Sequence, residues 1–196
     1  MERIASIVRQ TLETDIQLTL NLDGTGKRDI TTGIGFLNHM LTLFTVHGFF
    51  DLSVHAKGDL HVDLHHTVED VALVLGDAFD KALGDRQGIQ RYGHAVVPMD
   101  ETLTAVTVDL SRRPYLVFRV PGLFPESGDR FDVGLCKEFF RAFSVRAGMN
   151  LHINVRYGEN QHHILESMFK AAGRALDGAV SMDRRITDIH STKGLL

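Results

Sequence analysis

The chain has 196 residues, 43% of them hydrophobic and 23% charged, with a formal net charge of −4. This composition is typical of a globular protein with a sizeable core, and the lack of a basic run argues against nucleic acid or an anionic membrane as partner. No apolar run could span a membrane, no signal-peptide core is visible, and the single cysteine, Cys136, cannot form an internal disulfide, so we expect a cytoplasmic protein.

The first half of the chain mixes strand and helix patterns. Apolar and polar residues alternate in four segments, and the run from Asp23 to Gly26 (DGTG) is a turn signal after the second of them. Strands are therefore expected at 5–11, 15–22, 27–32 and 51–56. Helical periodicity predicts helices at 36–47 and 66–83, and Gly84 would end the second helix.

The second half repeats the same order of patterns. Strands are expected at 94–99, 102–109, 115–119 and 151–156. Helices are expected at 133–147 and 163–181. Because no linker rich in proline, glycine or serine separates the halves, we expect one compact domain over 1–196, with halves of about 1–92 and 93–182 and a C-terminal tail.

The two halves can be aligned residue by residue. The segment GFLNHMLTLFTVHGFFDLSVHAKG from Gly35 matches GLCKEFFRAFSVRAGMNLHINVRYG from Gly134, and the helix pattern at 71–83 matches that at 168–180. Gly76 then stands opposite Gly173. The repeat is longer than that of solenoids, so an α+β fold made by internal duplication is the better interpretation.

A short cassette of metal-binding residue types occurs in each half. The two cassettes, DLHHTVED and NQHHILES, contain His65, His66 and Glu69 in the first copy, and His162, His163 and Glu166 in the second. Residues four apart share one face of a helix, so the first histidine and the glutamate of each copy can hold one metal ion. A metalloprotease motif would place glutamate directly after the first histidine, which excludes that class.

The second histidine of each cassette points about 100° away from the first. We therefore expect crosswise sharing, in which His66 completes the site of the second cassette and His163 that of the first. His39 is the natural additional ligand. With eleven histidines and one cysteine, the ligand chemistry favours Zn, Mn, Fe or Ni over a thiolate site.

Six stretches are similar to one family. RQTLETDI, TGIGFLNHML, DLHVDLHHTVEDVALVLG, DLSRRPYLVF, GENQHHILESMFKAAGRAL and STKGLL resemble the single-function form of the imidazoleglycerol-phosphate dehydratase family over essentially the whole chain. The resemblance implies two halves, each a four-stranded mixed sheet with two helices (ribosomal S5 domain 2-like). It also implies a cytoplasmic hydro-lyase of L-histidine biosynthesis that eliminates water from D-erythro-imidazole glycerol phosphate to give imidazole acetol phosphate.

The resemblance further implies two Mn²⁺ ions per active site and a shell of 24 subunits with active sites at subunit contacts. It implies these metal ligands: His39, His65, His66, Glu69, Glu138, His162, His163 and Glu166. Glu138 stands opposite His39 in the duplication, at a position where some family members have histidine. Glu138 is therefore either a carboxylate ligand or a residue that does not coordinate.

Catalytic and substrate-binding residues follow from the same resemblance. Glu13 would shuttle the proton, and the other residues implied in catalysis are His39, His65, Glu69, His163 and Glu166. The residues implied in substrate binding are Glu13, His39, His47, His65, Glu69, Arg91, Arg113, His162, Lys170, Ser191, Thr192 and Lys193. Without the family, the arginines and lysines of this set would be interpreted as ordinary surface charges.

Other residues and functions remain open at this level. His152 is either a hydrogen-bond partner of a metal ligand or, preferably, a core histidine, and Cys136 is expected in the core. The surface or structural histidines are His55, His61, His94 and His190. Two alternatives to the dehydratase are a metal-dependent hydrolase, which would not need the phosphate-binding set, and a metal store, which would not need Glu13.

Overall fold

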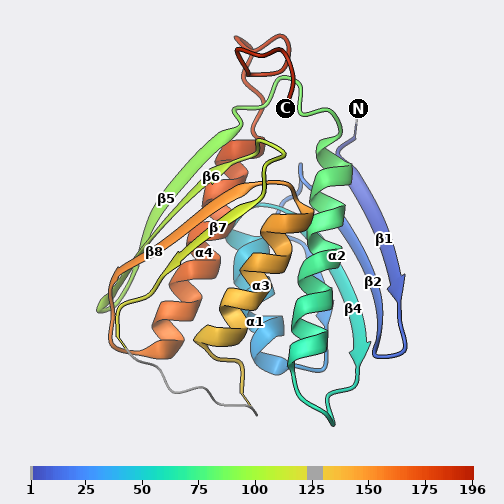
Figure 1. Ribbon diagram of the computed structural model, residues 1–196, viewed down its shortest axis with the longest axis vertical. Helices are drawn as coiled ribbons and strands as arrows, with labels where there is room; N and C mark the ends of the chain where they lie inside the picture. Colours follow the sequence, from blue (N-terminus) through green and yellow to red (C-terminus); the bar gives the residue numbers. More distant parts are fainter. Residues whose placement is uncertain (1, 123–129) are drawn as a thin grey trace.

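The computed structural model describes residues 2–122 and 130–196. Within these residues, two four-stranded sheets enclose four helices, so the chain has three layers (Figure 1). Each sheet turns its buried face toward the helices and its other face outward. The α+β class and the two similar halves are therefore confirmed.

The first half forms one sheet with two helices. Its elements are β1 (Ile4–Gln10), β2 (Thr14–Asn21), β3 (Arg28–Thr31), α1 (Gly35–His47), β4 (Asp51–Gly58) and α2 (His65–Leu83). The strand order is β1-β2-β4-β3, with β3 parallel to β4 and the other pairs antiparallel. On β2, Ile16, Leu18 and Leu20 are buried at every second position, as a half-buried strand requires.

The second half repeats this arrangement. Its elements are β5 (Tyr92–Met99), β6 (Thr102–Asp109), β7 (Tyr115–Arg119), α3 (Val133–Arg146), β8 (Asn150–Tyr157) and α4 (Gln161–Val180), in the sheet order β5-β6-β8-β7. The ends of the predicted elements lie within two residues of these bounds. Asn160 caps α4, because its side chain accepts a hydrogen bond of 2.9 Å from the backbone N–H of His162.

Helices of opposite halves cross at the two glycines that the duplication aligns. At Gly76 of α2, an added Cβ would lie 2.9 Å from the backbone oxygen of Phe143 on α3. At Gly173 of α4, it would lie 2.5 Å from the backbone oxygen of Phe44 on α1. Each crossing therefore brings two backbones closer than any residue with a side chain allows.

The register of the duplication changes along the chain. The β1–β2 pair begins at Ile4 and the β5–β6 pair at Tyr92, an offset of 88 residues. The offset is 99 at β4 and β8, because the connection from β7 to α3 runs over 120–132 and its counterpart from β3 to α1 only over 32–34. It is 97 at the two cassettes. Glu13 directly precedes β2 and Glu101 directly precedes β6, so these two glutamates occupy equivalent positions.

The C-terminal tail runs along the segment that connects α2 to β5. Isolated bridges pair Gln87 with Ile189 and Ile89 with Met182, and the Arg91 guanidinium donates a hydrogen bond of 2.7 Å to the backbone oxygen of His190. These contacts tie the tail to the end of the molecule where α4 finishes (Figure 1). Among the described residues, no helix is long and apolar enough to cross a membrane.

Candidate active site

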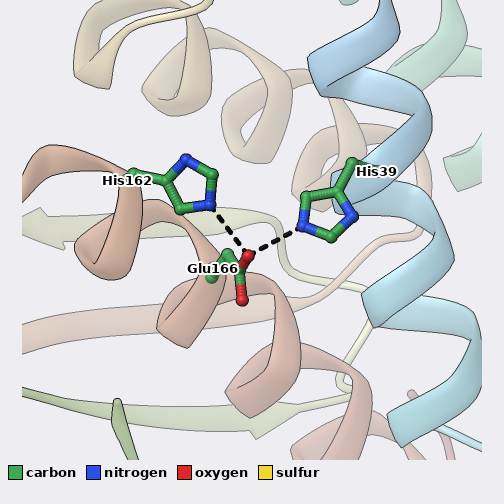
Figure 2. A group of neighbouring side chains, drawn as sticks. All are labelled: His39, His162 and Glu166. Carbon is green, nitrogen blue, oxygen red and sulfur yellow. Dashed lines mark hydrogen bonds and ion pairs between the residues drawn. The ribbon is translucent and has the colours of Figure 1, made fainter. Parts of the chain in front are cut away.

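Three predicted ligands meet between α1 and α4 (Figure 2). Oε1 of Glu166 lies 2.7 Å from Nε2 of His39 and 2.9 Å from Nε2 of His162. The ligand atoms of the three side chains all lie within 4.8 Å of one another. His162 and Glu166 share one face of α4, as their spacing predicts, and α1 supplies His39 from the other half.

The Glu166 carboxylate is buried and strongly hydrogen-bonded. Its side chain is only 8% exposed, and its second oxygen accepts a hydrogen bond of 2.7 Å from Nζ of Lys170. Burial alone would raise the pKa of Glu166, but the hydrogen bonds from Lys170, His39 and His162 together lower the pKa to about 2. Imidazole nitrogens around an ionised carboxylate are a donor set that suits a divalent transition metal.

We expect Glu166 to make the stability of the metal-free protein depend on acid pH. Its pKa is about 2 in the folded state against 4.5 for a free side chain. A lowered folded-state pKa stabilises above the unfolded value, and the gain is lost as pH falls from 4.5 toward 2. The difference corresponds to about 3 kcal/mol. Urea unfolding of wild type and Glu166→Gln across this range measures it.

In that measurement, the free-energy difference between the two proteins should shrink as pH falls. Glu159→Gln, which removes an exposed carboxylate just before α4, is the matched control and should follow wild type. A difference that stays constant between pH 5 and the lowest accessible pH would contradict the assigned ionisation of Glu166.

The first cassette is arranged differently. Nε2 of His65 lies 3.7 Å from Oε2 of Glu69. Arg141 of α3 joins Glu69 to Glu138, with its nitrogens 2.9 Å and 2.6 Å from the two carboxylates. In the part of the chain that the structure describes, these donors form no tight group like that around Glu166. The guanidinium of Arg141, which sequence reasoning did not single out, occupies the position between the two acidic side chains.

The second histidine of each cassette is held by a carboxylate at Nδ1. For His66 this is Asp59, at 3.0 Å, with Glu13 farther away at 3.8 Å. For His163 it is Glu101, at 2.8 Å. These hydrogen bonds raise the pKa of both histidines. Sequence reasoning missed Asp59 and Glu101, which lie outside the repeated cassettes.

The tail of the chain lines a separate, basic pocket. Ser191, Thr192 and Lys193 lie there together with Arg91 and Arg113. Arg91 is only 8% exposed and forms two hydrogen bonds with Asp109, of 2.6 and 3.1 Å. Arg91 is therefore not the ordinary surface charge that it would be taken for without the family resemblance. The signal that could have revealed its anchoring is Asp109, which ends the neighbouring strand β6.

Other predicted residues fall in several places. Within one chain, Lys170 lies at Glu166, away from the other basic residues of the predicted set. Burial lowers the pKa of His47, and the nearby charges of Lys170 and Arg174 lower it further. Cys136 is fully buried, as predicted. The preferred interpretation of His152 as a core histidine is wrong, because its side chain lies on the exposed face of β8.

Fold and site together define a class: a duplicated α+β protein in which imidazole and carboxylate groups could hold a divalent cation and a separate pocket is lined by basic residues. The family model described as imidazoleglycerol-phosphate dehydratase matches residues 32–176. The imidazoleglycerol-phosphate dehydratases of Desulfosudis oleivorans and Pelobacter propionicus are 61% and 56% identical to this chain over 196 residues, the full length of both partners.

Solved structures agree with the sequence relatives. The imidazoleglycerol-phosphate dehydratase of Staphylococcus aureus is 40% identical with a TM-score of 0.81, over 92% of this chain and 99% of that one. The enzyme of Pyrococcus furiosus, in complex with (S)-C348, is 37% identical with a TM-score of 0.83, over 97% and 100% of the chains. The chain belongs to the imidazoleglycerol-phosphate dehydratase family. It is a hydro-lyase of histidine biosynthesis that removes water from imidazole glycerol phosphate.

Proposed function

We propose that the dehydration takes place at a site that holds two Mn²⁺ ions and is completed only where copies of this chain meet. The observation that carries this proposal is a separation within one chain. The cluster of His39, His162 and Glu166 (the Glu166 cluster) lies apart from the basic pocket that Arg91, Arg113 and residues 191–193 line (the tail pocket). The family shows which reaction is catalysed. The metal, the assembly and the roles of individual residues are proposals that rest on the family resemblance, and the geometry and chemistry of the site support them. The cytoplasmic location stays a prediction.

The Glu166 cluster and the tail pocket lie toward opposite ends of α4. The backbone N–H of Arg91, in the pocket, donates to the backbone oxygen of Ala179. With 1.5 Å of rise per residue, Ala179 is about 20 Å along the helix from Glu166. An imidazole ring, three carbons and a phosphate, with bonds of about 1.5 Å, span only about 10 Å. One substrate therefore cannot reach both sites of one chain, and a second copy must bring its pocket to the cluster.

The ligand sets also favour a second copy. The cluster of His39, His162 and Glu166 offers three donors, fewer than Mn²⁺ commonly takes. We assign His66 of another copy as the fourth protein ligand, since Asp59 engages its Nδ1 and leaves Nε2 to the metal. In the second metal site, His65 and Glu69 of one chain would be ligands together with His163 of another copy. Glu138 would join that site once Arg141 moves away.

The reaction requires removal of a proton from carbon and loss of a hydroxyl group. When bound, the metal ions act as Lewis acids toward the ring and a hydroxyl of the substrate. We assign the proton transfer to Glu13, whose side chain is 54% exposed and lies 3.8 Å from the ring of His66. The substrate phosphate is assigned to Arg91, Arg113, Ser191, Thr192 and Lys193, with Lys170 and His47 contributing from the cluster side.

A metal-removal experiment tests this proposal. We expect protein stripped with a chelator to lose dehydration of imidazole glycerol phosphate and to recover it with Mn²⁺. We also expect the stripped protein to run smaller on size exclusion and to regain its size with Mn²⁺, because metal ligands from different copies link assembly to metal binding. Full activity after verified metal removal would contradict the cofactor, and an unchanged particle would contradict the link to assembly.

A further inference from the structure

His163 must meet a chemical condition if it is to bind metal through Nε2. A neutral imidazole has one protonated nitrogen, so Nε2 is free only when the proton is on Nδ1. Histidine ligands are usually kept in that form by a hydrogen-bond acceptor at the other nitrogen. The structure therefore has to supply an acceptor at Nδ1 of His163.

Glu101 is that acceptor, and every contact of its carboxylate comes from a donor. Oε2 lies 2.8 Å from Nδ1 of His163. Oε1 accepts from three groups: the hydroxyl of Thr102 at 3.0 Å, the backbone N–H of Glu159 at 3.2 Å and the backbone N–H of Asn160 at 2.9 Å. Three donors at Oε1 fix the carboxylate, so that Oε2 can only face the imidazole.

We infer that Glu101 is a positioning residue of the dehydratase: it holds His163 in the tautomer and orientation that present Nε2 to a metal ion. This inference rests on the proposed two-metal site, to which it adds a residue outside the ligand set.

The duplication supports a distinct role for Glu101. Glu101 and Glu13 occupy equivalent positions before β6 and β2, yet they contact the equivalent histidines differently. Glu101 lies 2.8 Å from His163, whereas Glu13 lies 3.8 Å from His66, whose Nδ1 is taken by Asp59 at 3.0 Å. The two halves thus meet the same requirement with different carboxylates, and Asp59 leaves Glu13 available for the substrate.

A purely structural role for Glu101 is the competing interpretation, because its carboxylate also ties down the loop before α4. The variant Glu101→Gln distinguishes the structural role from the positioning role. The amide oxygen of the substituted side chain can still accept from the three donors that surround Oε1. The NH₂ group of the amide must then face His163, where it donates to Nδ1 and moves the ring proton to Nε2. The loop is kept, while the metal-binding nitrogen is blocked.

The first test uses the metal-free protein. Long-range ¹H–¹⁵N spectra at alkaline pH, where imidazole is neutral, report which nitrogen of His163 is protonated. We expect the Nδ1–H tautomer in wild type and the Nε2–H tautomer in Glu101→Gln. Wild-type His163 protonated mainly at Nε2 would overturn the inference before any variant is made. Because no metal is present, that result would not depend on the proposed function.

The second test is a Mn²⁺ titration followed by electron paramagnetic resonance. We expect Glu101→Gln to lower the binding affinity for one of the two Mn²⁺ ions by about 10- to 100-fold. Glu101→Asp, which keeps a carboxylate, should recover part of this loss. Glu159→Gln, which removes a charge from the same loop, should match wild type. Wild-type affinity for both ions in a folded Glu101→Gln variant would overturn the inference, whereas two ions never binding to wild type would overturn the proposed function instead.

Discussion

Glu13→Gln should reduce turnover by about 10²- to 10⁴-fold while leaving the metal content and particle size unchanged. The amide keeps the shape of the side chain but cannot take a proton from a substrate carbon. Glu13 is exposed at the turn before β2 and lies 3.8 Å from the nearest nitrogen of His66, which Asp59 already holds. Removing its charge should therefore disturb the reaction and not the fold.

The measurement is steady-state dehydration of imidazole glycerol phosphate with Mn²⁺ content determined on the same samples. Asp15→Asn is the matched control, because Asp15 is an exposed carboxylate two residues away on β2, and its activity should stay near that of wild type. Near-normal turnover of Glu13→Gln would remove Glu13 from the proton-transfer role.

Mixing two inactive variants should restore activity. His66→Asn damages the ligand that a chain donates to its neighbour, whereas Glu166→Gln damages the cluster in its own chain. If the two variants are stripped of metal, mixed in equal amounts and reassembled with Mn²⁺, random pairing leaves about one quarter of these sites with both wild-type residues. We expect up to that fraction of wild-type activity from two nearly inactive proteins.

The informative control mixes His162→Asn with Glu166→Gln. Both residues lie in one cluster of one chain, with 2.9 Å between their ligand atoms, so every cluster in the mixture carries a defect and activity should stay low. If the first mixture also stays inactive although mass spectrometry shows mixed particles, His66 does not serve a neighbouring chain.

Local patterns in the sequence predict most of this fold. The helices and strands follow from periodicity, and the pairing of His162 with Glu166 follows from their spacing on α4. The position of His152 also follows from a local pattern, since Leu151 and Ile153 on either side are fully buried and strand residues alternate. The alternation therefore predicts an outward-facing side chain for His152, in place of the core position expected above.

Long-range relations explain what the sequence could not predict. Glu101 matches Glu13 only through the register of β5 and β6, whose offset of 88 differs from the 99 that aligns the helices before the cassettes. Arg141 bridges Glu69 and Glu138 across two packed helices, a contact that needs tertiary structure. Neither relation leaves a periodic signal along the chain.

The two helix crossings at Gly76 and Gly173 show how the two halves of the chain depend on each other. Gly76 meets Phe143 of the second half, and Gly173 meets Phe44 of the first, so the same contact is made twice in reciprocal directions. This is the pattern of an isologous dimer interface, drawn here within one polypeptide. Each half covers the inner helices of the other. A half expressed by itself would expose that face and would be expected to pair with a second copy of itself.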